Sequence, residues 1–198
     1  MSKRIITISR EFGSGGRYIG EQVAKELGIA YYDKEIIAEV ATKTGLAKEF
    51  VEEKGEYSPM KTLFGYGFVG RNLNGQSMED MLDSVQRSII LEAAEKSPCV
   101  IIGRNADYIL RDRDDVLNVF ITGDREVKKE RICRLYEKTE KEAEQLLHDI
   151  DKKRSIHYKF YTEQTWGMAS NYTITLNSSE LGFETCISFL KELYQREA

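Results

Sequence analysis

Short apolar runs recur along the chain, and most are followed by a segment in which apolar positions repeat at helical spacing. Because such runs are apolar on both faces, they predict strands of a parallel sheet with helices on both sides. The pattern therefore predicts an α/β chain, a three-layer α/β/α fold with a mostly parallel sheet of about five strands. The predicted strands cover residues 5–8, 29–32, 99–102, 116–121 and 172–176.

Glycines mark the expected ends of the first two helices. Gly28 follows a segment with apolar residues at positions 19, 23, 24 and 27, and Gly45 follows a second such segment. Glycine ends a helix well because it adopts the left-handed conformation without strain. Two more amphipathic patterns predict helices over residues 81–95 and 181–194.

A strongly charged helical region extends over residues 124–163. Thr139 and Glu142 have the spacing of a capping box, which predicts that a new helix begins there. We expect one domain over residues 1–198 and assign residues 124–163 to a charged helical lid.

Residues 46–80 differ in character from the rest of the chain. Between residues 55 and 75, five glycines alternate with aromatic side chains and no sustained period is found. We expect a helical or flap insertion on the acceptor side of a binding site. Stacking of its aromatic rings on a base and contact with a second copy of the chain, as in a homo-oligomer, are both open interpretations.

Composition excludes several classes of protein. The 198 residues carry a formal net charge of −4, which argues against binding polymeric nucleic acid through a broad basic face. No apolar run has the length of a membrane span, so we expect no membrane association and a cytoplasmic location. Three scattered cysteines and two histidines argue against a structural zinc site or a disulfide framework.

The loop after the first predicted strand is a candidate phosphate site. Gly13, Ser14, Gly15 and Gly16 lead into a helix, and Arg17 follows where a P-loop carries lysine. Glycines let backbone amides approach a phosphate, and the helix N-terminus adds positive charge. Glu11 stands where the pattern expects its first glycine, and Tyr18 where it expects a magnesium-binding hydroxyl. A glycine-rich turn without a ligand is therefore the competing interpretation.

Basic residues also gather in the second half of the charged region. Residues 152–159 contain four lysines or arginines and no acid. We expect Lys152 and Lys153 on a solvated helix face, and we assign Arg154 to phosphate binding. The two histidines, His148 and His157, lie in charged helical surroundings and are expected at the surface.

Four blocks of sequence, in order, resemble the cytidylate kinase-like family, a divergent branch of the P-loop nucleoside monophosphate kinases. Residues 6–17 resemble its opening strand and loop, and residues 100–107 resemble the Gly-Arg-Asp segment that contacts the monophosphate. Residues 151–158 are similar to the lid segment, and residues 171–177 to the last strand. The resemblance implies a P-loop kinase fold and nucleotide substrates.

On the donor side, the resemblance implies ATP and Mg²⁺ as cofactors. Residues 13–17 would hold the ATP phosphates, with Arg17 and Arg154 as the catalytic arginines. Arg131 would lie near the adenine or its phosphates. Ser14 is the candidate magnesium ligand, and Asp33 or Asp107 could also help to hold the ion directly or through water.

On the acceptor side, the resemblance implies that Arg104 binds the monophosphate, with Asn105 where cytidylate kinases carry an acid. Asp33, Asp107 and Tyr158 complete the expected acceptor site. We expect a kinase that transfers the ATP γ-phosphoryl to a CMP-like nucleotide or similar small acceptor. A catalytically weak nucleotide-binding regulator and a phosphotransferase for a non-nucleotide acceptor are the alternatives.

Overall fold

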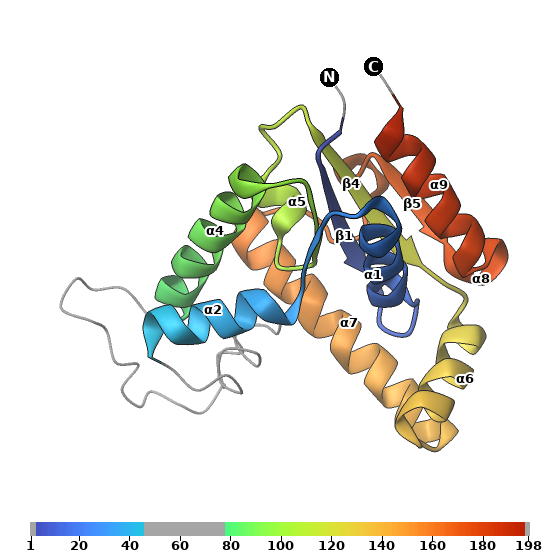
Figure 1. Ribbon diagram of the computed structural model, residues 1–198. Coiled ribbons are helices and arrows are strands. Elements are labelled where there is room, and N and C mark those ends of the chain that lie inside the picture. The colour runs from blue at the N-terminus through green and yellow to red at the C-terminus, as the bar shows by residue number, and fades with distance from the viewer. Residues whose placement is uncertain (1–2, 46–77, 197–198) are drawn as a thin grey trace.

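The computed structural model describes residues 3–45 and 78–196. All but the last three residues of the predicted insertion over residues 46–80 therefore lie outside the described residues, as does its aromatic segment. Within the described ranges, helices and strands alternate along most of the chain (Figure 1).

Five strands form one sheet in the order β2-β3-β1-β4-β5, and every neighbouring pair is parallel. The predicted α/β fold with a parallel sheet of about five strands is confirmed. Because β1 is central and all strands point the same way, the segments that follow β1, β3 and β4 meet at one edge. The strands are β1 (Ile5–Arg10), β2 (Ala30–Tyr32), β3 (Cys99–Ile102), β4 (Val116–Thr122) and β5 (Ile174–Asn177).

The helices cover both faces of the sheet. They are α1 (Gly16–Leu27), α2 (Lys34–Thr44), α4 (Met78–Lys96), the short α5 (Ala106–Ile109), α6 (Arg125–Tyr136), α7 (Glu140–Thr162), the 3₁₀ turn η1 (Ala169–Asn171), α8 (Ser178–Leu181) and α9 (Phe183–Gln195). Among these helices, none has the combination of length and apolarity that spanning a bilayer requires.

Alternation of side chains along β1 divides the core into two clusters. Ile5 packs with α2, α4 and α5 on one face, whereas Ile6 and Ile8 pack with α1 and α9 on the other. All three isoleucines are fully buried. A strand buried on both faces gives the apolar run seen in the sequence and fixes the end of β1 between two packed layers.

Capping accounts for where several helices begin and end. Gly28 ends α1 in the left-handed conformation, and its amide donates to carbonyls in the last turn. The Thr139–Glu142 capping box is present at the start of α7. At the closing segment the structure differs from the predicted helix over residues 181–194, because Gly182 has a φ of 74° and a ψ of 160° and separates α8 from α9.

Candidate functional site

The glycine loop joins the end of β1 to the start of α1. Gly15 has a φ of 80°, and a Cβ added there would lie 2.4 Å from the Phe183 ring. Gly16 has no such positive φ, but a Cβ there would lie 2.6 Å from Cβ of Arg10. Conformation and space therefore both explain why small residues occupy this turn.

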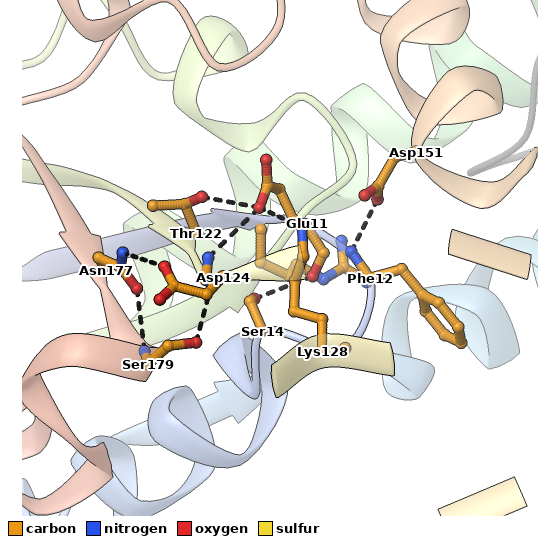
Figure 2. A network of polar contacts seen from close by, with 12 residues as sticks. Glu11, Phe12, Ser14, Thr122, Asp124, Lys128, Asp151, Asn177 and Ser179 are labelled. Carbon is orange, nitrogen blue, oxygen red and sulfur yellow. Dashed lines mark hydrogen bonds and ion pairs between the residues drawn. The ribbon is translucent and has the colours of Figure 1, made fainter. Parts of the chain in front are cut away.

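Glu11 ties the loop to the start of α6. Its Oε2 accepts hydrogen bonds from Oγ1 of Thr122 at 2.7 Å and from Nζ of Lys128 at 2.6 Å (Figure 2). The Gly123 amide donates to the same oxygen at 3.3 Å. The acid that departs from the P-loop pattern thus fixes the loop against the β4–α6 turn.

A second set of polar contacts joins that turn to the end of β5. The Asp124 amide donates to Oγ of Ser179 at 2.8 Å, and Nδ2 of Asn177 donates to the Asp124 carboxylate at 2.8 Å. Ser178 donates to the Ser14 carbonyl at 2.6 Å. The glycine loop is therefore supported from β4, α6 and α8 together.

Helix α7 contacts the loop with two charged side chains. Oδ1 of Asp151 accepts the Phe12 amide at 2.7 Å, and Nη1 of Arg154 donates to the Arg10 carbonyl at 3.1 Å. Burial raises the pKa of Asp151 to about 6, against the opposing effect of the Phe12 hydrogen bond and of Arg154. These contacts fix the middle of α7 at the carboxyl edge of β1.

A pocket opens beside this edge and is lined by three arginines. Arg10 comes from the end of β1, Arg104 from the turn after β3, and Arg154 from α7, and all three are largely buried. Such a convergence of guanidinium groups suits an anion with several oxygens. The remaining lining residues are Ser9, Gly103, Asn105, His157, Tyr158 and Trp166.

The turn after β3 has an unusual backbone. Gly103, Arg104 and Asn105 have successive φ values of 64°, 63° and 54°. Arginine rarely adopts the left-handed conformation, so Arg104 is strained by about 1–2 kcal/mol. The turn nevertheless places both Arg104 and Asn105 in the lining of the pocket.

Asp107 lies behind the pocket in a buried polar cluster. Its carboxylate accepts from Oη of Tyr158 at 2.7 Å and from Oγ of Ser9 at 3.3 Å. Burial raises the pKa of Asp107, and burial together with the nearby Asp107 carboxyl raises the pKa of Tyr158. Asp107 is absent from the pocket lining, so in this structure it positions Tyr158 and Ser9.

The structure brings together four of the sequence-predicted residues. Arg104, Asn105, Arg154 and Tyr158 line one pocket, although they come from the β3–α5 turn and from α7. Nδ2 of Asn105 lies 3.4 Å from Nδ1 of His157.

Arg17 and Asp33 are paired with one another, although the sequence assigned them to the donor and acceptor sides. Nε of Arg17 lies 2.6 Å from the Asp33 carboxylate, and the Arg17 side chain is 48% exposed. Neither residue lines the arginine pocket.

The remaining predicted donor-side residues support the loop. Nη1 of Arg131 donates to the Gly13 carbonyl, and its guanidinium lies over the Phe183 ring. The Ser14 hydroxyl is buried and donates to the Glu11 carbonyl at 2.9 Å. To bind a metal ion, it would have to turn out of the loop.

Five of the nine residues that line the pocket were not predicted as site residues: Ser9, Arg10, Gly103, His157 and Trp166. His157 was expected at the surface, but only 4% of it is exposed, because it faces inward from α7. Arg10 ends an apolar strand, and no local pattern marks its side chain as functional. His148, Lys152 and Lys153 are exposed, as expected.

The profile of the cytidylate kinase-like family matches residues 5–180. The chain belongs to this family. The match includes the glycine loop, the Arg104 turn and the part of α7 that supplies Arg154 to the pocket. Among curated proteins, none matches this chain.

Solved structures confirm the fold of this cytidylate kinase-like protein. An uncharacterized protein from Eubacterium ventriosum is similar, with a TM-score of 0.75, 26% identity, and 98% of this chain and 100% of that chain covered. The shikimate kinase from Bacteroides thetaiotaomicron has a TM-score of 0.57 and 18% identity, over 97% and 98% of the two chains. The shikimate kinase from Acinetobacter baumannii in complex with shikimate gives 0.54 and 15%, over 96% and 92%. The architecture is that of P-loop kinases.

Proposed function

We propose that this protein is an ATP-dependent phosphotransferase that acts on a small anionic acceptor, such as a CMP-like nucleotide. The observation that carries the proposal is the pocket in which Arg10, Arg104 and Arg154 converge beside the glycine loop. Phosphoryl transfer needs positioning and positive charge around the moving group more than covalent chemistry from the protein. A pocket built from three guanidinium groups supplies both.

The donor phosphates would bind at the glycine loop and the N-terminus of α1, where first-turn amides point along the helix axis. The acceptor's anionic group would bind Arg104, with Asn105 and Tyr158 beside it. An acceptor oxygen then forms a bond to the γ-phosphorus while the bond from that phosphorus to the bridging oxygen breaks, and ADP leaves. Residues 124–163 would act as the lid, and Arg154 would contact the phosphoryl group as it is transferred.

Magnesium would neutralise charge on the ATP phosphates. Among the residues that the structure describes, no group of three or more His, Cys, Asp or Glu side chains could hold a metal ion. Mg²⁺ bound to nucleotide commonly takes most of its ligands from phosphate and water. The site therefore fits an ion that arrives with ATP, and Ser14 would be its candidate protein ligand.

A non-nucleotide acceptor is the second candidate. The two shikimate kinases have this fold, and the one from Acinetobacter baumannii is in complex with shikimate. The arginine pocket would suit a carboxylate as well as a phosphate, because guanidinium pairs with both in a bidentate manner. The acceptor panel therefore has to contain both kinds of anion.

A nucleotide-binding regulator without catalytic activity is a third candidate. It is favoured by the contact between Asp151 and the Phe12 amide, because a carboxylate so close to the loop opposes the approach of phosphate. In this interpretation ATP binds and no acceptor is phosphorylated.

A coupled assay of ADP release, run with ATP, Mg²⁺ and one acceptor at a time, tests the proposal. The panel contains CMP, dCMP, UMP, AMP, GMP and shikimate. We expect turnover that depends on one class of acceptor and is lost in Arg104→Gln. ATP binding without turnover on any acceptor would favour the regulator instead.

A further inference from the structure

The glycine loop has no lysine at its end, and the arginine that stands in its place is paired with an acid outside the loop. Arg17 follows the last glycine, but its guanidinium contacts Asp33 at 2.6 Å and 3.4 Å. This contact lies beyond the end of β2, and Arg17 does not line the arginine pocket. Two other cations at the loop already contact it, because Lys128 pairs with Glu11 and Arg131 donates to the Gly13 carbonyl. We therefore look for a further side chain that could contact the phosphates there.

Arg10 has the required position. It is the last residue of β1, only 5% of it is exposed, and it lines the pocket. A Cβ added to Gly16 would lie 2.6 Å from its Cβ and 3.1 Å from its Cγ. A Cβ added to Gly103 would lie 2.2 Å from its Nη1. The side chain therefore passes the first residue of α1 and ends against the turn after β3.

Both glycines leave room for this side chain. Gly16 has no positive φ, and a Cβ there would meet Cβ of Arg10 at 2.6 Å and Cβ of Ile121 at 3.3 Å, so close packing against β1 and β4 explains the missing side chain. Gly103 combines a φ of 64° with its contact to the guanidinium. A side chain at Gly103 would displace the Arg10 guanidinium.

We propose that Arg10, and not Arg17, is the phosphate-binding cation of the loop. This inference rests on the proposed function and adds a residue to it. Its side chain starts beside Gly16 of the glycine loop, and its guanidinium lies against Gly103, the residue before Arg104. The Arg154 hydrogen bond to the Arg10 carbonyl, at 3.1 Å, holds the strand end from which the side chain extends.

The charges around the guanidinium favour a polyanionic phosphate as the ligand. Arg104 and Arg154 line the same pocket, so three like charges repel one another there. Asp151 offsets part of this charge, because its carboxylate lies 3.6 Å from Nη1 of Arg154, whereas Asp107 is hydrogen-bonded to Tyr158. An oligophosphate with several negative charges would relieve the repulsion among the arginines.

The test measures binding of inorganic tripolyphosphate, and then of ATP, by isothermal titration calorimetry without any acceptor. Arg10→Gln removes the charge and keeps the Cβ and Cγ that pack beside Gly16, whereas the guanidinium that packs against Gly103 is lost. We expect it to weaken tripolyphosphate binding at least about tenfold, as loss of a charge-assisted hydrogen bond does. Arg10→Lys keeps the charge and should lose less.

Two further variants make the result specific. Arg17→Ala removes the competing cation and should weaken tripolyphosphate binding less than about threefold. Arg125→Ala removes a 69% exposed arginine on α6 and controls for net charge. Thermal unfolding monitored by circular dichroism verifies that each variant is folded.

The outcomes separate this inference from the proposed function. If Arg10→Gln loses tripolyphosphate binding and the wild-type protein phosphorylates no acceptor, the assignment of Arg10 to phosphate binding is supported and the kinase proposal fails. A large loss in Arg17→Ala with unchanged binding in Arg10→Gln would overturn the assignment to Arg10. So would a wild-type protein that does not bind tripolyphosphate or ATP.

Discussion

Asp151, in the middle of α7, accepts the backbone amide of Phe12 in the glycine loop at 2.7 Å. These two residues are 139 positions apart in the chain, so the contact joins the predicted lid to the predicted phosphate loop. Burial raises the pKa of the Asp151 carboxyl to about 6. The contact therefore has a measurable consequence for stability.

Asp151→Asn is expected to change how stability depends on pH. The folded protein holds the Asp151 proton up to about pH 6, whereas the ordinary value is 3.8, so folding binds a proton between these limits. The contribution of this group to the free energy of unfolding is fully present below the unfolded pKa. It is lost as pH rises through about 6, and the loss amounts to about 1–3 kcal/mol. Urea unfolding of both proteins at pH 4 and pH 7 measures the difference.

Asparagine keeps an oxygen for the Phe12 amide and removes the buried charge. We therefore expect the variant to gain stability relative to wild type at pH 7 but not at pH 4. Equal pH dependence in the two proteins would mean that Asp151 does not titrate in this window.

Gly15→Ala should destabilise the protein by about 1–3 kcal/mol, because alanine is strained at a φ of 80° and its Cβ would meet the Phe183 ring. Gly28→Ala is the matched control. Gly28 has a φ of 66° with nothing within 4 Å of an added Cβ. Denaturant unfolding of both variants separates the backbone strain, which they share, from the steric clash. Equal losses would show that Phe183 gives way without cost.

Tyr158→Phe tests the buried cluster behind the pocket. It removes the 2.7 Å hydrogen bond to Asp107, which then keeps its weaker contact with Ser9. We expect a loss of about 1–3 kcal/mol in the free energy of unfolding. Tyr136→Phe, at a half-exposed position on α6, should change it by less than about 0.5 kcal/mol. Similar small losses in both variants would contradict a structural role for the Tyr158–Asp107 bond.

Arg104→Asn should separate acceptor binding from folding. Asparagine tolerates the left-handed φ of 63° better than arginine, so it relieves strain while removing the guanidinium. We expect the acceptor KM to rise at least about tenfold while the KM for ATP changes little. Arg111→Ala, at an exposed position just downstream, is the control. An equal rise in the KM for the acceptor and the KM for ATP would contradict a specific role of Arg104 in acceptor binding.

The sequence predicted β1, β3 and β4 well because these strands are buried on both faces. Residues such as Ile6, Ile101 and Ile121 therefore form apolar runs that are visible without any knowledge of contacts. The capping box at Thr139 could also be predicted, because its partner Glu142 is only three residues away in the sequence. Elements defined by neighbours in the chain could be predicted in this way.

The site was predicted in part, and what was missed depends on distant contacts. Arg10, Arg104 and Arg154 all lie in blocks that resemble the family, but only its place in the pocket and its approach to Gly103 mark Arg10 as a candidate. His157 resembles a surface residue in sequence, because the exposed lysines of α7 lie around it. The pairing of Arg17 with Asp33 likewise depends on how α1 packs beside β2.

Phosphorus NMR of the wild-type protein with ATP, Mg²⁺ and CMP tests the central proposal most directly. The account predicts that signals of ADP and of a newly formed phosphorylated acceptor grow together, with the pair absent in Arg104→Gln. If ATP binds and its γ-phosphorus signal persists with CMP and with every other anion of the panel, the protein is not the phosphotransferase proposed.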